Sequence, residues 1–172
     1  MKPRLALLTL LGAAANGCGI TENFPMPPPV VAFELRNGGT ESTFLFQGCL
    51  LDYAITSLVA SPYRIERGAG CSCDCDQGSC PVCQPCSQGP QTVIAGSAVY
   101  DRWTAVNITL ETTASGSCER KQRLPDGPYR IDVPVYGTAE DAAARTNART
   151  VTQEFSIPTP GGLVSVALSS SP

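Results

Sequence analysis

The sequence predicts an all-β protein, an antiparallel sandwich of about 7–9 strands with a cysteine-rich loop inserted between two of them. Short segments in which apolar and polar residues alternate recur along the chain, as in strands that are buried on one face. The 172 residues include 16 Gly and 15 Pro, which favour turns, and only 16% are charged, which argues against a helical bundle. Six of the nine cysteines fall between residues 71 and 86, in a stretch without strand periodicity.

Five segments alternate clearly and are predicted to be strands, and three further segments alternate less clearly. The clear segments are residues 31–36, 51–56, 106–111, 129–136 and 164–169, and the weaker ones are 44–47, 92–95 and 150–157. Residues 139–148 have a helical pattern, and we expect one or two turns there. Pro134 cannot donate a backbone hydrogen bond, so the strand that contains it is predicted to lie at a sheet edge or to carry a bulge.

The chain is predicted to divide into three parts. They are a signal peptide at residues 1–17, a proline-rich linker at 18–29, and the sandwich at 30–172 with its cysteine-rich insertion at 68–90. Lys2 and Arg4 precede an apolar run at residues 5–15, which is typical of a secretory signal. This run would rise only about 16 Å as a helix, which is too short to cross a hydrocarbon core of about 30 Å.

A cysteine follows directly after a small residue at the end of the apolar run, in Ala15-Asn16-Gly17-Cys18. This pattern resembles the lipobox of bacterial lipoproteins, and the resemblance implies that Cys18 is lipidated and that acyl chains attach the protein to a membrane. Gly19 after the cysteine implies the outer membrane of the bacterial cell envelope. Setting Cys18 aside also leaves an even number of cysteines for disulfides. Ala15-x-Gly17 suits ordinary signal peptidase as well, so secretion of a free protein is the alternative.

A second resemblance concerns the sandwich itself. It rests on four motifs, which are Asn37-Gly38, Val93-Ile94-Ala95-Gly96-Ser97, Trp103 and Asp126-Gly127-Pro128-Tyr129. In this order they resemble the immunoglobulin-like sandwiches of the bacterial intracellular proteinase inhibitor type, which implies an immunoglobulin-like arrangement of the strands. Trp103 is predicted to lie in the core, and Tyr129 to be a core tyrosine whose hydroxyl holds a neighbouring loop.

The cysteine-rich loop contains the one set of residues in the chain with a recognisable chemical pattern. The set is Cys71, Cys73, Cys75, Cys80, Cys83 and Cys86. Three disulfides within the loop would suit the oxidising compartment of an exported protein. Alternatively, the Cys-x-Cys and Cys-x-x-Cys spacings would allow the thiolates to bind a soft metal such as Cu(I) or Zn(II). We favour the disulfides, which need no metal or other cofactor.

Cys49 and Cys118 are the two cysteines that remain, and we predict that they bond to each other. Cys49 precedes the predicted strand at residues 51–56, and Cys118 follows the one at 106–111. Both cysteines therefore lie near strand ends, where distant segments of a sandwich approach one another. The alternative is that one of them joins the cysteines of the loop, because eight cysteines allow 105 pairings.

Composition excludes several classes of function. The chain has no His, which excludes His-based catalytic triads and imidazole-bound zinc, and its net charge of −3 gives no basic surface for nucleic acid. We therefore predict that the protein is not an enzyme but a membrane-anchored lipoprotein, either structural or able to bind an envelope or secreted protein. The alternatives are a soft-metal binding protein and a protease inhibitor, both acting through the cysteine-rich loop.

Overall fold

The computed structural model describes residues 27–68, 72–76, 82, 84–113 and 116–169, and over these residues it is an all-β fold, as predicted. The described strands are β1 Val30–Arg36, β2 Thr43–Gln47, β3 Ala54–Ser57, β4 Tyr63–Ile65, β5 Gly89–Val93, β6 Ala98–Thr104, β7 Val106–Thr113, β8 Gly116–Arg123, β9 Gly127–Val135, β10 Arg149–Ile157 and β11 Leu163–Ala167. One short helix, α1 Ala139–Ala144, lies where the helical pattern predicts it, and a single 3-10 turn covers Pro160–Gly162. Within the described ranges, no helix is long and apolar enough to span a bilayer.

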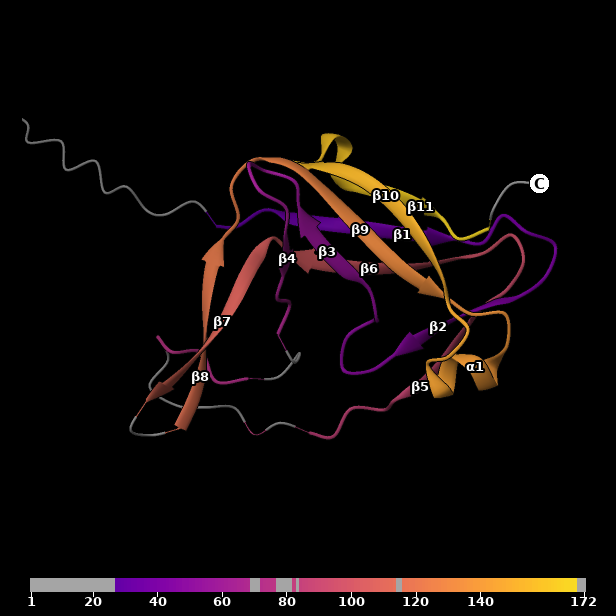
Figure 1. The fold of residues 1–172 in the computed structure, drawn as a ribbon, viewed down its shortest axis with the longest axis horizontal. Helices are drawn as coiled ribbons and strands as arrows, with labels where there is room; N and C mark the ends of the chain where they lie inside the picture. Colours follow the sequence, from indigo (N-terminus) through magenta and orange to yellow (C-terminus); the bar gives the residue numbers. More distant parts are fainter. Residues whose placement is uncertain (1–26, 69–71, 77–81, 83, 114–115, 170–172) are drawn as a thin grey trace, which may run out of the picture.

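Two main sheets form the body of the molecule, in the strand orders β11-β1-β6 and β10-β9-β3-β4. Figure 1 shows β9 and β10 crossing over β1, β6 and β11, while the β7–β8 hairpin extends away from both sheets. Strands β2 and β5 form a second two-stranded ribbon. The pairs are antiparallel except for β1 and β11, which run parallel. Strand β11 follows β10 from the opposite sheet, so no tight hairpin forces it to run antiparallel to β1.

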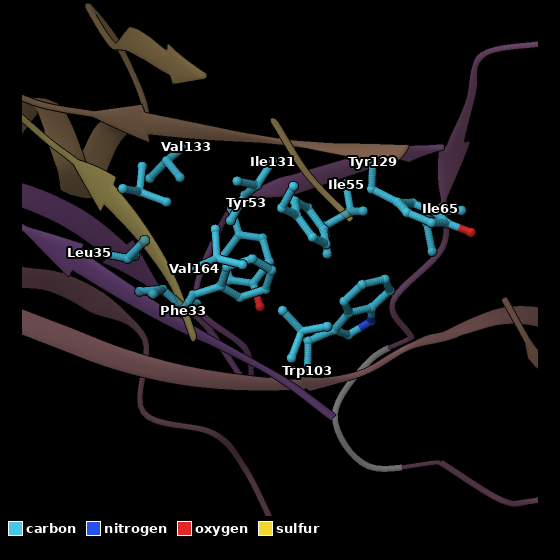
Figure 2. Close-up of a cluster of buried hydrophobic side chains, with 14 of the residues drawn as sticks. Phe33, Leu35, Tyr53, Ile55, Ile65, Trp103, Tyr129, Ile131, Val133 and Val164 are labelled. Atoms are coloured by element: carbon cyan, nitrogen blue, oxygen red, sulfur yellow. The ribbon is translucent and has the colours of Figure 1, made fainter. Parts of the chain in front are cut away.

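The two sheets enclose one hydrophobic core. Along β1 the alternation places Val31, Phe33 and Leu35 on the inner face, each at most 1% exposed. The Phe33 ring packs edge-on against Tyr53 and Phe155, with a centroid separation of 5.4 Å in both pairs. Figure 2 shows how side chains from both sheets meet around Phe33. Offset and edge-on aromatic contacts add to the free energy that burial itself supplies.

Trp103 and Tyr129 lie where the sequence predicts them. Trp103 belongs to the core cluster and is 6% exposed. Tyr129 is fully buried, and its hydroxyl donates a hydrogen bond to the backbone oxygen of Pro125 at 2.7 Å. This bond holds the turn that leads into β9, which confirms the predicted role of the tyrosine hydroxyl.

The prediction that the Pro134 strand lies at a sheet edge or carries a bulge is wrong, because β9 lies between β10 and β3 and its register with β10 is continuous from Gly127 to Val135. Asp132 is the last residue of β9 that pairs with β3. Beyond it, Tyr136 exchanges both of its backbone hydrogen bonds with Phe44 of β2. Alternate residues of a strand direct their backbone groups to the same side, so the nitrogen of Pro134 faces the gap between β3 and β2. A proline there removes no ladder hydrogen bond.

Glu34 is a buried carboxylate on the outer face of the β11-β1-β6 sheet. Arg36 Nη2 donates to its Oε1 at 2.6 Å, the Tyr100 hydroxyl donates to the same oxygen at 2.9 Å, and Ser165 Oγ donates to Oε2 at 2.9 Å. These hydrogen bonds, that from Arg36 first, lower the pKa of Glu34 from its ordinary 4.5 to about 2. The charged form of Glu34 therefore joins all three strands of this sheet.

Replacing Glu34 by Gln should alter the acid stability of the protein. A carboxylate whose pKa is lowered on folding stabilises the fold above its unfolded pKa, and this contribution is lost as the pH falls from about 4.5 to about 2. We expect E34Q to be less stable than the parent at pH 7 and the difference to disappear across that window. Urea midpoints measured from pH 7 to pH 2 check this, with E140Q, at an exposed position of α1, as the control. A constant difference at every pH would contradict the prediction.

Candidate binding site

The described cysteines are oxidised and connect the cysteine-rich loop to the body of the protein. Cys49 bonds to Cys86 and Cys75 bonds to Cys118, and in each pair the Cα atoms are 5.0 Å apart. Cys73 is disulfide-bonded as well. Cys18, Cys71, Cys80 and Cys83 lie outside the described residues, so the predicted lipidation site is among the positions of which the structure says nothing.

Two predictions about the cysteines are wrong. Cys49 and Cys118 do not bond to each other, because each bonds to a different cysteine of the loop. The loop is consequently not closed by three internal disulfides, since Cys75 and Cys86 both bond outside it. Cys49 follows the end of β2 and Cys86 precedes β5, so pairing of these two strands brings the cysteines together. The disulfides attach the loop at two points rather than closing it on itself.

The loop also hydrogen-bonds to the hairpin through its backbone. Glu119 N donates to the Cys73 oxygen at 2.6 Å, and Cys75 N donates to the Glu119 oxygen at 3.0 Å. Asp74 thereby forms a parallel bridge with Glu119 on β8. We call the β7–β8 hairpin together with residues 72–76 the cysteine lobe. It is in effect a hairpin with a short third segment, held by main-chain hydrogen bonds and by a disulfide.

Exposed ion pairs also join the segments of the cysteine lobe to one another. Lys121 Nζ lies 2.9 Å from Asp74 Oδ2, and this hydrogen bond is the main cause that lowers the pKa of Asp74. Arg120 contacts Glu111 at 2.5 Å across the hairpin and Asp76 at 3.3 Å. Such exposed pairs add little stability one by one, but they orient loop and hairpin relative to each other.

The oxidised cysteines also bear on the metal-binding alternative. Cys75, Cys118 and Glu111 bring possible ligand atoms within 4.8 Å of one another. However, the sulfurs of Cys75 and Cys118 are bonded to each other, and a disulfide sulfur is not the thiolate that Cu(I) or Zn(II) requires. Cys73 and Cys86 are removed from the proposed ligand set for the same reason. The described cysteines of the proposed ligand set therefore do not fit the soft-metal site that the spacings suggest, whereas Cys71, Cys80 and Cys83 lie outside the described residues.

Arg67, just after β4, lies where the cysteine lobe meets the body. Its guanidinium carbon is 3.4 Å from the centroid of the Tyr53 ring, and Nη1 donates to the backbone oxygens of Leu51 and Tyr53, both at 2.9 Å. Nη2 lies 3.6 Å from Asp101 Oδ2. Burial is the main cause that lowers the pKa of Arg67, so the guanidinium is a cation held in a poorly solvated place. Nothing in the sequence pattern singles out this arginine.

A cavity of about 480 Å³ lies between the cysteine lobe and the body. Its lining residues are Leu50, Arg67, Ser72, Arg102, Trp103, Thr104, Val106, Ile108, Glu119 and Lys121. A second cavity of about 300 Å³ adjoins Arg67 on the side of Phe46 and Tyr53. Pockets of this size are typical of small-ligand sites, and sequence reasoning missed both because their walls come from distant segments.

An exposed hydrophobic side chain, that of Leu110, lies on the hairpin that lines the larger cavity. Among the described residues, Val82 on the cysteine-rich loop and Leu110 on β7 are the most exposed large hydrophobics, at 95% and 76%. Leu110 shares a face of β7 with Val106 and Ile108, which line the larger cavity, because alternate residues of a strand point the same way. An apolar stripe therefore runs from the cavity to the outer part of the lobe.

The fold and the lobe together define a β-sandwich with a disulfide-bonded side lobe. No protein-family model, curated protein or solved structure matches the chain.

Proposed function

We propose that this protein is an exported, lipid-anchored and non-enzymatic β-sandwich that binds another protein through the cysteine lobe. The observation that carries the proposal is that the lobe is attached by a disulfide and exposes a large apolar side chain, that of Leu110. Leu110 is 76% exposed on a hairpin whose loop is attached by the Cys75–Cys118 disulfide. Large apolar side chains exposed on a rigid support are typical of protein-recognition surfaces.

Rigidity is what makes the lobe suitable for binding. A flexible loop loses conformational entropy when a partner orders it, at about 0.5–1.5 kcal/mol per immobilised long side chain. The backbone bridge at Asp74 and the ion pair between Lys121 and Asp74 restrict the loop before any partner arrives. We infer that the disulfides serve to preorganise the recognition surface.

The proposed partner is a protein of the cell envelope or a secreted protein, since disulfides persist in that compartment. Acylation of Cys18 would attach the chain to a membrane, with residues 18–29 as a semi-rigid spacer. The anchor and the lobe are separate parts of the proposal and are tested separately.

Replacing Cys18 by Ala should abolish acylation and release the exported protein from membranes. The thiol of Cys18 is the atom that would carry the lipid, so alanine removes the attachment point without touching the described fold. Mass spectrometry of the N-terminal peptide and fractionation into soluble and membrane pools measure the effect. C49A together with C86A is the control that alters other cysteines and should keep the anchor. If C18A still sediments with membranes, the lipoprotein proposal is wrong.

A photo-crosslinking residue at Leu110 should trap a discrete protein partner in intact cells. Leu110 is exposed on the proposed recognition face, whereas Gln153 is exposed on β10 in the body and is the matched control. We expect an adduct of one defined mass at Leu110, none at Gln153, and loss of the Leu110 adduct when Cys75 and Cys118 are both alanine. Equal labelling at the two positions, or none, would contradict the proposed role of the lobe.

The protease-inhibitor alternative predicts a particular result of the same experiment. The trapped partner would be a secreted protease, and the exported protein would inhibit it in solution. Inhibition would again depend on the Cys75–Cys118 disulfide, because canonical presentation of a loop to a protease cleft requires a fixed loop conformation.

A further inference from the structure

Two side chains that line the larger cavity, those of Trp103 and Arg67, each carry a buried N–H group without an acceptor. Trp103 is 6% exposed, and neither its Nε1 nor Nε of Arg67 has a hydrogen-bond partner among the described residues. Figure 2 shows the Trp103 nitrogen on the side of the ring that faces away from Phe33 and Leu35. An unsatisfied buried donor costs about 1–3 kcal/mol, so two of them on residues that line one cavity require an explanation.

The cavity is also basic on balance. Three cationic side chains line it, those of Arg67, Arg102 and Lys121, against one carboxylate, that of Glu119. Lys121 is paired with Asp74, and Arg67 Nη2 lies 3.6 Å from Asp101 Oδ2, yet burial still disfavours the charge of Arg67 and lowers its pKa. An anionic group beside Arg67 would reduce that cost, because opposite charges in a poorly solvated site attract strongly.

The remaining walls are apolar. Leu50, Val106 and Ile108 line the cavity together with the face of Trp103. A ligand that matches all of these features has an acceptor-rich anionic end and an apolar body. A carboxylate carries negative charge and has two acceptor oxygens, so it can accept from two separate N–H donors while its alkyl chain contacts the apolar wall.

We propose that this cavity binds the carboxylate end of an apolar ligand, with Trp103 Nε1 and Arg67 Nε as donors and the Val106–Ile108 face of β7 as the apolar wall. The carboxylate belongs either to a free aliphatic acid or to the C-terminus of a peptide. The inference goes beyond the protein-binding role of the lobe and does not rest on it.

Trp103 is the only tryptophan of the chain, so its fluorescence reports directly on the cavity. The exported C18A protein is titrated with hexanoate and with hexanamide, the neutral isostere, in buffer free of carboxylates. We expect a saturable change in emission with hexanoate that is at least about tenfold weaker with the amide, since a hydrogen bond to a charged group contributes roughly 1.5–3 kcal/mol. Equal responses to the two, or no saturable response to any carboxylate probe, overturn the proposal.

The source of the carboxylate is decided by a second pair of probes, acetyl-Ala-Ala-Leu with a free C-terminus and the same peptide as its amide. Saturation with hexanoate alone assigns the cavity to free acids. Saturation with the free-ended peptide alone assigns it to chain termini. If both carboxylates bind and each amide binds more weakly than its carboxylate, the proposed chemistry is supported for both sources.

Calorimetry with two variants locates the site. W103F removes the indole N–H and keeps an aromatic ring, and we expect it to weaken binding by about tenfold or more. R102Q alters the lining charge without altering the core and should weaken binding several-fold, whereas R130Q on β9 is the matched control and should not. Thermal melts establish that each variant is folded. Unchanged affinity in both W103F and R102Q overturns the assignment of the site.

Because these measurements use the unanchored protein and small probes, their failure leaves the crosslinking and fractionation results untouched. A negative outcome of the crosslinking or fractionation experiments likewise does not contradict the proposed carboxylate binding in the cavity.

Discussion

Replacing both Cys75 and Cys118 by alanine is expected to lower the free energy of unfolding by about 4 kcal/mol in the chain-entropy account, given a sequence separation of 43. The loss is a large share of the roughly 5–15 kcal/mol that stabilises a typical domain. Urea denaturation of the exported proteins measures it. C49A with C86A spans a similar separation of 37 and should cost about the same globally.

The two double variants should differ in which backbone amides exchange faster with solvent. Cys118 lies on β8, so its loss should accelerate amide exchange in the β7–β8 hairpin. Loss of Cys49 and Cys86 should act instead at the end of the β2–β5 ribbon. Identical exchange patterns in the two double variants would show that the lobe is not a separate unit.

Tryptic mapping of the unreduced protein checks whether Cys49 and Cys118 each bond to the cysteine-rich loop rather than to each other. No Lys or Arg lies between residues 68 and 101, so the peptide 68–102 contains both Cys75 and Cys86, while Cys49 lies in 37–64 and Cys118 in 103–120. The observed pairs join these three peptides into one adduct that reduction separates. A two-peptide adduct of 37–64 with 103–120 that lacks 68–102 would instead show that Cys49 bonds to Cys118.

Replacing Phe33 by alanine is expected to destabilise the sandwich by about 3–5 kcal/mol. Phe33 is fully buried and contacts the rings of Tyr53, Trp103 and Phe155, which come from both sheets. Removing it loses the transfer free energy of the ring and leaves a cavity that the sheets cannot close without moving together. The effect is measured as a shift in the urea midpoint.

Val30 on the same strand is the matched control. It is 55% exposed, and V30A should change stability by less than about 0.5 kcal/mol. F33A should raise exchange in both main sheets rather than in the lobe alone, because its contacts hold the sheets together. A loss below about 1 kcal/mol would mean that the core around Phe33 is packed far less tightly than its complete burial indicates.

Sequence periodicity predicts those strands that have one buried and one solvated face. Residues 150–157 coincide closely with β10, and the alternation of β1 and β9 identifies their inward residues correctly. Periodicity does not find β6, β8 or the short β4. In β8 the side chains of residues 120–123 are all exposed, so solvent on both faces leaves no apolar alternation to detect.

The sequence also determined the parts of the candidate site that depend on single residues. Tyr129 after its turn, Trp103 in the core and a cysteine-rich loop between strands are all properties of local sequence. Each follows from what one side chain can do at a strand end or in a turn.

Only the tertiary structure decided which cysteines meet. Cys49 reaches Cys86 because β2 pairs with β5, and Cys75 reaches Cys118 because the loop lies along β8. Both pairings are non-local, and the spacing of cysteines contains no information about which strands become neighbours. The same holds for the cavity, where Arg67, Trp103 and Ile108 from three segments meet only after the hairpin folds against the body. Local residues set what each segment can form, whereas long-range pairing sets which segments share a site.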